Sequence, residues 1–541
     1  MANPLDTTLS LLEHSRNQAA VPVLVAALDA PHVNIRSGAV RALVRRRSPN
    51  GHTAVLRHFS KFGEREHAVL VESLPVAADN LKAALHDAVA DECEDLCESA
   101  CHLILLGRAY DHLSTLVSVA EQRNHRHSDQ AAATLIRLTR MLHEELAGQR
   151  RRQGRDPFFM RRQVLPPFER SMLRYAEHER LEIVDAFLLL VPPTSPTLEK
   201  ILSDSTQTCY EPVVTSLRSS AVRAIVELLT QLMHDTDLPR AALDVVAERI
   251  DRKFLDHFLH HVGSPVSLRV LENMKRMRSV SWLQESRGVL AELDGPAQAN
   301  AVELAVASGI GRPAVFELLT FLLDRGKTEG RRASCAALAR FRDLRAEQCV
   351  LDALHDDEPT VRAAAVRQLR SRGVLDAMER LVVLLDDRAV EVRDAARSSL
   401  AEFNFVRYES LYDSMDDAMR KSTGKLVGKV DPSARSRLTG MLSTPSPSTK
   451  LRGLEMVINM QLADAVRELL VHLLEDCDLA IRTDAATALG FCTSTDVLPA
   501  LRKAECDPHR PVREAAERSL DQIADNLMHG TASPLASGHM Q

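Results

Sequence analysis

Aromatic residues, glycine and long apolar runs are all scarce in this sequence. Phe, Trp and Tyr make up 4% of the 541 residues, with a single Trp, and glycine occupies 21 positions, below the usual share of about 7%. Few aromatics and little glycine, beside many Ala and Leu, favour helix over sheet. The most apolar run, residues 186–191, ends at a Pro-Pro pair and is far shorter than the roughly 20 residues of a membrane-spanning helix. No membrane span is therefore expected.

An excess of positive charge and a set of paired cysteines are also lacking. The 68 Lys and Arg face 74 Asp and Glu, for a net charge of −6, which excludes a uniformly basic nucleic-acid coat protein. The nine cysteines are odd in number and lie mostly in apolar helical stretches, unlike the disulfide framework of a short secreted chain. The first residues show no basic stretch followed by an apolar one, so no secretory signal is expected. These features predict a reduced, cytoplasmic protein.

What the sequence does contain is an internal repeat. The stretch from Leu354 to Leu369 returns from Leu385 to Leu400, and a second pair of copies follows at 474–489 and 506–520. Weaker copies centre on Arg332, Arg420 and Arg452, and another copy surrounds Arg36. A regular period of about 31 residues predicts a stack of similar units that share one core.

Each repeat is expected to contain two helices. Before and after residue 388, apolar residues recur at i, i+3, i+4 and i+7, which is the stripe of an amphipathic helix. Asp-rich turns separate the two helices and supply N-cap residues. Gly373 and Gly490 follow helices, where a left-handed residue is favoured. The fold class predicted is all-α, an α-α superhelix in the form of a HEAT-like helical solenoid.

An Asp-x5-Arg phrase marks the regular repeats and carries a resemblance to a known family. It occurs in four places: Asp356 with Arg362, Asp387 with Arg393, Asp476 with Arg482, and Asp507 with Arg513. The chain resembles HEAT-repeat proteins, specifically the bacterial PBS-lyase HEAT-like type and the large bacterial HEAT-repeat proteins that have no known activity. The resemblance implies that these eight residues form a structural ladder between neighbouring repeats.

The repeat pattern is uneven, which predicts a division into segments. The segments are N-terminal HEAT-like repeats at 1–149, a basic connector at 150–168, degenerate helical repeats at 169–325, regular HEAT-like repeats at 326–525, and a disordered tail at 526–541.

The connector carries the densest basic run of the chain. Its arginines are Arg150, Arg151, Arg152, Arg155, Arg161 and Arg162, with Phe158 and Phe159 among them. Such a run is a candidate patch for phosphates or for an acidic partner. The negative net charge and the scarcity of stacking aromatics argue against a nucleic-acid partner, and a solvated connector is the favoured interpretation.

Two clusters contain side chains able to bind metals. Cys93, Cys97 and Cys101 recur at i, i+4 and i+8 before His102, but such thiols span about 12 Å along a helix, too far for one tetrahedral ion. The cluster of His257, His260 and His261 lacks the Glu of a His-Glu-x-x-His site. Both clusters are interpreted as structural, and no metal or cofactor is expected.

Two further patterns imitate enzyme motifs. The pairs His143-Glu144 and His178-Glu179 invite comparison with deoxyhypusine hydroxylase, a di-iron HEAT-repeat enzyme that resembles this chain in architecture. That family uses four such pairs, so the two here argue against its activity. The bilin lyases of the same repeat superfamily have no residue signature that can be located in this sequence. Gly326-Lys327-Thr328 ends like a phosphate-binding loop, but Phe321 stands where that motif requires glycine.

Together these patterns predict a non-enzymatic scaffold that binds other proteins along an extended concave helical surface. Nucleic-acid or anion binding through residues 150–162, and a lyase-like or di-iron activity, are the two alternatives.

Overall fold

A computed structural model describes residues 4–46, 48–73, 79–148, 156–285 and 287–530. These residues form helices and turns and contain no strand, which confirms the all-α prediction. They divide into two compact units, 1–318 and 319–541. The division falls within the segment predicted to be degenerate, shortly before its expected end at 325.

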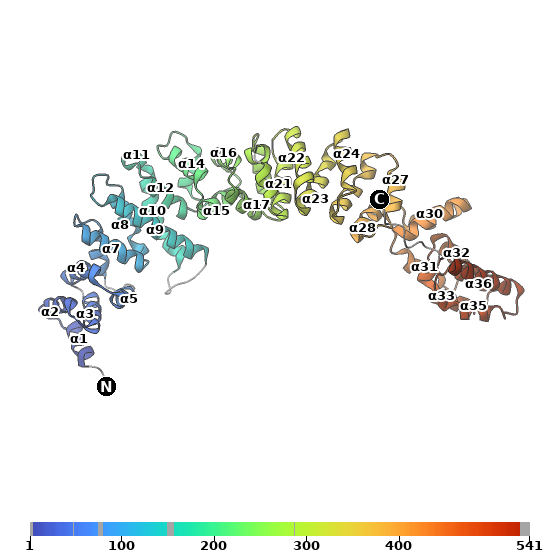
Figure 1. The fold of residues 1–541 in the computed structure, drawn as a ribbon, viewed down its shortest axis with the longest axis horizontal. Helices are drawn as coiled ribbons and strands as arrows, with labels where there is room; N and C mark the ends of the chain where they lie inside the picture. The colour runs from blue at the N-terminus through green and yellow to red at the C-terminus, as the bar shows by residue number, and fades with distance from the viewer. Residues whose placement is uncertain (1–3, 47, 74–78, 149–155, 286, 531–541) are drawn as a thin grey trace, which may run out of the picture. The chain divides into compact units, whose positions relative to one another are not determined.

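The first unit is a succession of mostly short helices (Figure 1). They are α1 (Pro4–His14), α2 (Ala20–Ala26), α3 (Val33–Arg45), α4 (Pro49–His58), α5 (Glu64–Ser73), α6 (Asp79–Val89), α7 (Glu94–Leu106), α8 (Leu113–Ala120), α9 (Ser128–Ala147), α10 (Pro157–Leu173), α11 (Tyr175–His178), α12 (Leu181–Leu190), α13 (Pro196–Ser203), α14 (Tyr210–Ser219), α15 (Arg223–Leu232), α16 (Arg240–Glu248), α17 (Arg252–His261), α18 (Leu268–Arg276), α19 (Ser281–Gln284), α20 (Arg287–Glu292) and α21 (Gly295–Ala307).

The second unit begins within α22 (Arg312–Arg325), which crosses the division. Its other α-helices are α23 (Thr328–Ala337), α24 (Leu344–Ala353), α25 (Pro359–Val366), α26 (Leu369–Arg372), α27 (Ala377–Leu384), α28 (Val390–Ser399), α29 (Phe405–Leu411), α30 (Asp417–Val430), α31 (Ala434–Leu442), α32 (Pro447–Met460), α33 (Arg467–Leu473), α34 (Leu479–Leu489), α35 (Leu498–Ala504) and α36 (Arg510–Gly530).

The second helices of successive repeats pack directly on one another in the second unit. α23 contacts α25, α25 contacts α28, and the series continues through α30, α32, α34 and α36. Small residues allow this close stacking: Ala395, Ala396, Ala485 and Ala486 are fully buried in α28 and α34. Each repeat therefore shares its core with the next, as expected for a solenoid.

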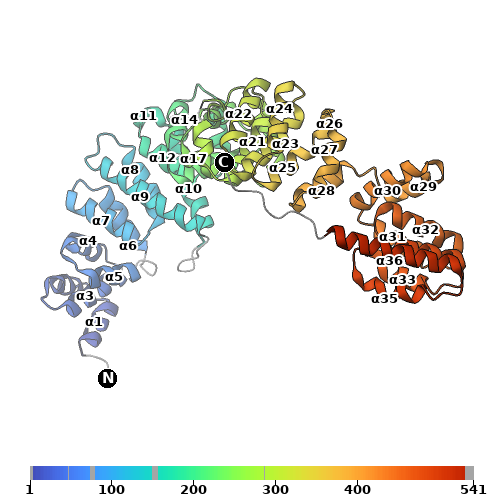
Figure 2. The ribbon, with the colours of Figure 1, turned by 45° about the vertical axis from the view of Figure 1, so that its right-hand side comes forward.

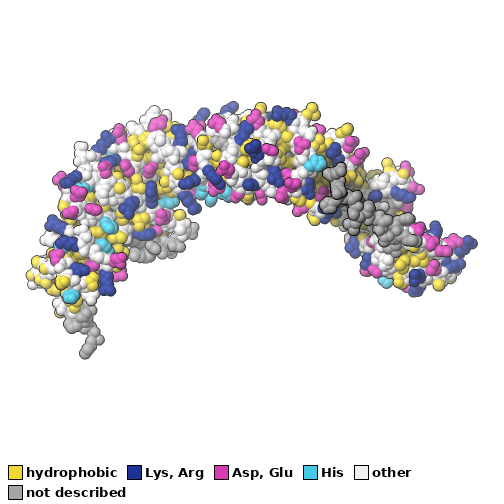
Figure 3. Space-filling model, in the orientation of Figure 1, with side chains coloured by type: hydrophobic (Ala, Val, Ile, Leu, Met, Phe, Trp, Pro, Cys, Tyr) yellow, Lys and Arg dark blue, Asp and Glu magenta, His cyan; other side chains and the backbone are white. Residues whose placement is uncertain are grey.

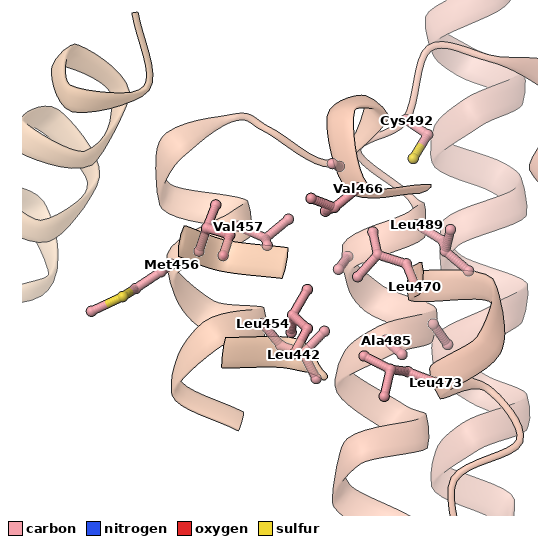
Figure 4. Close-up of a cluster of buried hydrophobic side chains, with 14 of the residues drawn as sticks. Leu442, Leu454, Met456, Val457, Val466, Leu470, Leu473, Ala485, Leu489 and Cys492 are labelled. Atoms are coloured by element: carbon pink, nitrogen blue, oxygen red, sulfur yellow. The ribbon is translucent and has the colours of Figure 1, made fainter. Parts of the chain in front are cut away.

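The largest buried cluster of the second unit shows how this sharing works. Leu442 of α31 and Leu454 of α32 lie beside Leu470 and Leu473 of α33, and Ala485 of α34 closes the cluster (Figure 4). All five are between 0% and 5% exposed. Side chains of four consecutive helices thus form one continuous core, and no single helix pair among them buries its own apolar face.

Local sequence signals explain several helix ends. Asp343 and Asp478 cap α24 and α34 by accepting hydrogen bonds from backbone N–H groups of the first turn. Gly373 ends α26 in the left-handed region, with φ of 70°. Gly490 does not: its φ is −61°, and a Cβ there would lie 2.7 Å from the Ser519 hydroxyl. Close packing against α36, and not backbone conformation, requires glycine at 490.

The connector and tail differ in part from the segments predicted. Residues 157–168 lie within α10, with Pro166 and Pro167 inside that helix, and residues 149–155 lie outside the described part of the chain. α36 continues to Gly530, past residue 526, and 531–541 are also outside it. The remaining limits, at 149, 168 and 325, stay predictions.

Candidate functional site

The Asp of each Asp-x5-Arg phrase organises the turn between two helices. In all four phrases its carboxylate accepts a hydrogen bond from the backbone N–H two residues later, at 2.8 to 2.9 Å. This is an Asx turn, which holds the chain in the conformation that begins the second helix. The aspartate therefore acts locally before it meets any arginine.

The Arg of each phrase binds backbone of its own turn and, in two of the four phrases, the carboxylate of the next turn. Its Nη1 donates to the carbonyl oxygen of the Asp that opens the phrase, at 2.8 to 3.0 Å in all four copies. Arg482 also reaches Asp507 of the next repeat at 3.0 Å, and Arg362 lies 3.7 Å from Asp387. One guanidinium thus joins two successive repeats.

Polar contacts favour the charged form of two ladder carboxylates, Asp476 and Asp507. The Asp478 N–H and Lys450, which is 2.7 Å away, lower the pKa of Asp476 below its ordinary value. At Asp507, burial acts to raise the pKa, but hydrogen bonds from Arg482 and the His509 N–H outweigh it and the pKa is lowered. The two side chains are only 10% and 11% exposed, so little solvent competes with these bonds.

The ladder is irregular where the sequence phrase weakens. Arg331, and not Arg332, takes the ladder position before Arg362, because it binds the Gly326 carbonyl and Asp356. The weaker copies at Arg420 and Arg452 differ in geometry: they donate to the carbonyls of Tyr412 and Glu409, and Arg420 also lies 3.3 Å from Glu455 in α32.

The carboxylate pair is interrupted after Arg393. Asp507 follows Arg482 by 25 residues. The residue at the same interval after Arg393 is Ala418, whose side chain has no carboxylate. Arg393 still binds its own turn through the carbonyls of Asp387 and Arg388. A ladder arginine can therefore bind the carbonyls of its own turn without pairing with a carboxylate of the next turn.

A ladder pair that the Asp-x5-Arg phrase does not predict lies near the N-terminus. Arg36 binds the carbonyls of Ala30 and Pro31, as the other ladder arginines bind their own turns, and its Nε lies 2.9 Å from Glu66. The Glu66 side chain is 1% exposed and accepts a further bond from the Gly63 N–H. A glutamate inside a helix here replaces the aspartate of a turn.

Elsewhere the first unit ties its layers together through backbone carbonyls as well as through ion pairs such as Arg108–Glu145 and Arg174–Glu121. Arg249, with a side chain 1% exposed, donates to the carbonyls of Leu217 and Ser220 in the preceding layer. Asn273 donates to two carbonyls of the layer before it, and the Trp282 indole donates to that of Val246. These buried polar groups are occupied by structural bonds, which indicates a role in packing.

The basic run is only partly described. Arg150, Arg151, Arg152 and Arg155 lie outside the described residues, while Arg161 and Arg162 belong to α10. Arg161 lies over the half-exposed ring of Phe158, at 5.7 Å. On the face drawn in Figure 3, acidic and basic side chains alternate over the described surface. The anion patch at 150–162 stays a prediction.

The cysteine cluster is largely core. Cys97 and Cys101 are 0% and 1% exposed, whereas Cys93 is exposed at the start of α7. The hydrogen bond with Cys101, together with burial, raises the pKa of Cys97 above its ordinary value. The His102 ring packs 5.3 Å from that of Phe59. Among the described residues no group of three or more His, Cys, Asp or Glu is arranged to hold a metal ion.

The histidines of α17 also have structural partners. His257 and His261 stack with ring centroids 3.9 Å apart, and His260 lies 2.8 Å from Asp294. The Asp256 carbonyl and Asp294 raise the pKa of His260, whereas burial and the neighbouring His261 lower that of His257. The three imidazoles therefore do not share one partner.

The two His-Glu pairs occupy unlike surroundings. His178 is buried, where its Nδ1 accepts from the Arg180 N–H and its Nε2 lies 3.1 Å from the Ser171 carbonyl. His143 is half-buried, with its Nδ1 3.2 Å from the Leu189 carbonyl.

The segment that imitates a phosphate-binding loop follows a helix. The Gly326 N–H donates to the Leu322 carbonyl at the end of α22, whereas that motif follows a strand.

Two apolar features of the surface escape the sequence analysis. One is a set of exposed side chains at the repeat period, Leu344, Leu375 and Val406. The other is a pocket of about 350 Å³ between α29 and α30, lined chiefly by Phe403, Tyr408, Leu411, Met415, Met419 and Val427. The sequence signal of the first is the even spacing of the exposed residues, which is visible only once the repeat register and the exposure are known.

The described residues contain no helix long and apolar enough to cross a membrane. Comparisons with known proteins complete the description. Residues 316–401 and 436–521 match the family of HEAT repeats, and no curated protein matches the chain.

Many solved structures resemble the chain at low similarity. Human deoxyhypusine hydroxylase in complex with glycerol is 19% identical, with a TM-score of 0.19, over 45% of this chain and 97% of that one. A structure of Kap95p with RanGDP is 13% identical over 97% of this chain and 74% of that one, with a TM-score of 0.30. A chain from a study of cadherin and beta-catenin is 13% identical, with a TM-score of 0.29, over 96% of this chain and 95% of that one. Likenesses this weak indicate no function. The two matched ranges therefore carry HEAT repeats.

Proposed function

We propose that this protein is a non-enzymatic scaffold that binds another protein along the surface of its second helices. The observation that carries the proposal is the ladder of the second unit. The pairs Arg331–Asp356 and Arg482–Asp507, at 2.9 and 3.0 Å, fix neighbouring repeats to one another. A surface held in this way is preformed, and preorganisation lowers the entropic cost of binding a partner.

The composition of that surface supports a protein partner. α23 and α28 expose Arg332, Ala336, Asp394 and Ser398, which alternate in charge and size. Mixed polar surfaces of this kind are ordinary for protein–protein contacts. A nucleic-acid partner is not expected, because binding to phosphates requires a continuous positive surface.

Three finer features belong to the same proposal. The Asp-x5-Arg phrase supports repeats of the bacterial PBS-lyase HEAT-like type. The nine cysteines, all among the described residues and all free, support the cytoplasm as the compartment. The ladder side chains are engaged by one another or by the backbone of their own turns, which supports a structural role for them over a catalytic one.

Position-specific photo-crosslinking in cells tests the proposal. A benzoylphenylalanine at Ala336 or Ser398, both exposed on second helices, is expected to give crosslinked species of discrete mass. The matched control at Asp352, exposed on the first helix α24, should give none. Crosslinks that form from Asp352 alone, or from no position, would contradict the proposal.

A further inference from the structure

Three consecutive repeats expose a large apolar side chain at the same register. Leu344, Leu375 and Val406 are evenly spaced in the sequence, one per repeat, and are 82%, 81% and 52% exposed. They stand at one constant interval after Arg331, Arg362 and Arg393, close to the start of a first helix. A single exposed leucine is ordinary on a protein surface, but a repeated one is a feature of the stack. Leu344, Leu375 and Val406 are called the apolar stripe.

The fold itself does not require apolar residues at this register. At the same interval after Arg482 stands Thr495, and at the same interval after Arg36 stands Pro49. Both belong to repeats whose arginine makes the same bonds to its own turn. Because other repeats stack without the apolar side chain, its recurrence at three successive positions points to a contact outside the repeat.

The spacing of the stripe fits a helix laid across the repeats. Packed helices lie about 8–10 Å apart, and α23, α25 and α28 pack in succession, so equivalent side chains recur at about that distance. Residues i, i+7 and i+14 of a helix are about 10.5 Å apart. Same-face residues of an extended strand recur at about 7 Å, which matches the stripe less well.

The sequence beside the stripe contains more arginine than acid, although Arg370 pairs with Glu402 and Arg372 donates to the Phe341 carbonyl. The equivalent segments 339–345, 370–376 and 401–407 contain six arginines and three carboxylates, in a chain whose net charge is −6. Arg407, which lies beside Val406, is exposed and makes no ion pair among the described residues. An acidic partner would find complementary charge here and not over the chain as a whole.

A pocket between α29 and α30 lies on the same helix as Val406, although Val406 itself does not line it. Arg407 lines it together with Leu411 and Met419, which are 43% and 53% exposed. Figure 2 shows α29 beside α30, following α27 and α28 along the chain. Such a pocket can hold one large anchoring side chain, and a few anchors of this kind carry most of the binding energy of an interface.

We propose that the apolar stripe is a docking site for an acidic amphipathic helix of a partner protein, with apolar residues at i, i+7 and i+14. This inference rests on the proposed function, since both require a protein partner, but it uses residues near the starts of the first helices, at the opposite end of α24 from the crosslinking control Asp352. Such helix-in-groove recognition is a recurrent mode of peptide binding. The residue that enters the pocket is a large apolar one, flanked by a carboxylate that pairs with Arg407.

Selection from a display library tests this proposal with the full chain. The probe is a library of helical peptides three heptads long, selected on the immobilised wild-type protein and depleted on the Leu344→Ser/Leu375→Ser/Val406→Ser variant. Enriched peptides are expected to be net negative and to carry apolar residues seven apart. Their affinity for the triple variant should be at least about tenfold weaker, the loss typical when a few anchors are removed.

Two controls keep the result interpretable. The variant Leu268→Ser removes a similarly exposed leucine (78%) from the first unit and should leave peptide affinity unchanged. The circular dichroism and melting temperature of the triple variant should match the wild type, since the three side chains are exposed.

The other outcomes each overturn the proposal. They are enrichment of extended peptides with period-two apolar residues, enrichment of basic peptides, peptides that bind the triple variant equally well, and self-association of the chain abolished by the triple variant in sedimentation velocity. If crosslinks still form from Ala336 and Ser398 while no stripe-dependent peptide emerges, the docking site alone is wrong and the scaffold proposal stands.

Discussion

The two compact units hold their layers together with a different mixture of contacts. In the second unit, arginines pair with carboxylates of Asx turns one repeat away, as Arg482 does with Asp507. The first unit contains a similar pair, Arg36 with Glu66, but its buried arginine, asparagine and tryptophan side chains also donate to backbone carbonyls of the preceding layer, as Arg249 does. A solenoid needs each interface closed, and the comparison shows that a repeated ion pair is one of at least two ways to close it.

The largest loss of stability is expected at Arg249, a buried cation that binds two backbone carbonyls and the Asp251 carboxylate. Arg249→Met keeps the side-chain length but leaves all three acceptors without this donor, at a cost of about 3 kcal/mol in unfolding free energy. Urea unfolding followed by circular dichroism measures it. The control Arg218→Met removes an exposed pair with Glu248 and should cost less than about 0.5 kcal/mol. Equal costs would contradict the account of the first unit.

A smaller loss is expected at the ladder. Arg482→Met removes bonds to the Asp476 carbonyl and to Asp507, and should lower the unfolding free energy by about 2 kcal/mol. Arg393→Met is a matched control, because Arg393 makes the same carbonyl bonds but stands before Ala418. Arg393→Met should cost about half as much. If the two variants are equally unstable, the carboxylate of the next repeat contributes nothing.

Acid should weaken the second unit through its ladder carboxylates. The pKa values of Asp476 and Asp507 are lowered in the folded protein, so the unfolded chain takes up protons first as the pH falls below about 4. Their stabilisation is present above that pH and is lost as the pH falls through the lowered values. Unfolding free energy measured between about pH 5 and pH 2 should decline less steeply for Asp507→Asn than for the wild type. Parallel curves would argue against this linkage.

The smallest change in unfolding free energy is expected at the ladder pair with the longest distance, Arg362 with Asp387. The closest ion-pair atoms of Arg362 and Asp387 are 3.7 Å apart, and both side chains are 21% exposed. Asp387→Asn keeps the acceptor for the Ala389 N–H and should change the unfolding free energy by less than about 0.5 kcal/mol. Chemical denaturation of this variant and of Asp507→Asn shows whether the loss of unfolding free energy increases as the arginine–carboxylate distance becomes shorter. A larger loss at Asp387 would reverse the order expected.

The repeat and the helix pairs could be predicted from the sequence, because they depend on local periodicity. The four Asp-x5-Arg phrases are also visible there, but only Arg362 and Arg482 among their arginines lie near the carboxylate of the next repeat. The pattern pointed to Arg332 where Arg331 acts, since adjacent arginines are equivalent by pattern and only helix phase separates them. Within one phrase the pattern also suggests a pairing of Arg393 with the Asp387 carboxylate, whereas Arg393 binds the carbonyl of Asp387 and Arg362 faces its carboxylate.

The ties of the first unit could not be predicted, for a physical reason. A carbonyl acceptor is present at every residue, so a donor such as Arg249 needs no matching side chain and leaves no paired signal. Glu66 was missed for a related reason, because a glutamate within a helix does not complete the Asp-x5-Arg phrase. The apolar stripe could not be predicted either, because the sequence does not show that these side chains are exposed, and leucine at the start of a helix usually belongs to the core.

A double-mutant cycle on Arg482 and Asp507 tests the central claim most directly, namely that ladder side chains join one repeat to the next. The unfolding free energies of the wild type, Arg482→Met, Asp507→Asn and the double variant are compared. The account predicts a coupling energy of about 1–2 kcal/mol, because each single change already removes the shared contact. Additive effects, within about 0.3 kcal/mol, would contradict it and would mean that the ladder contact does not stabilise the stack.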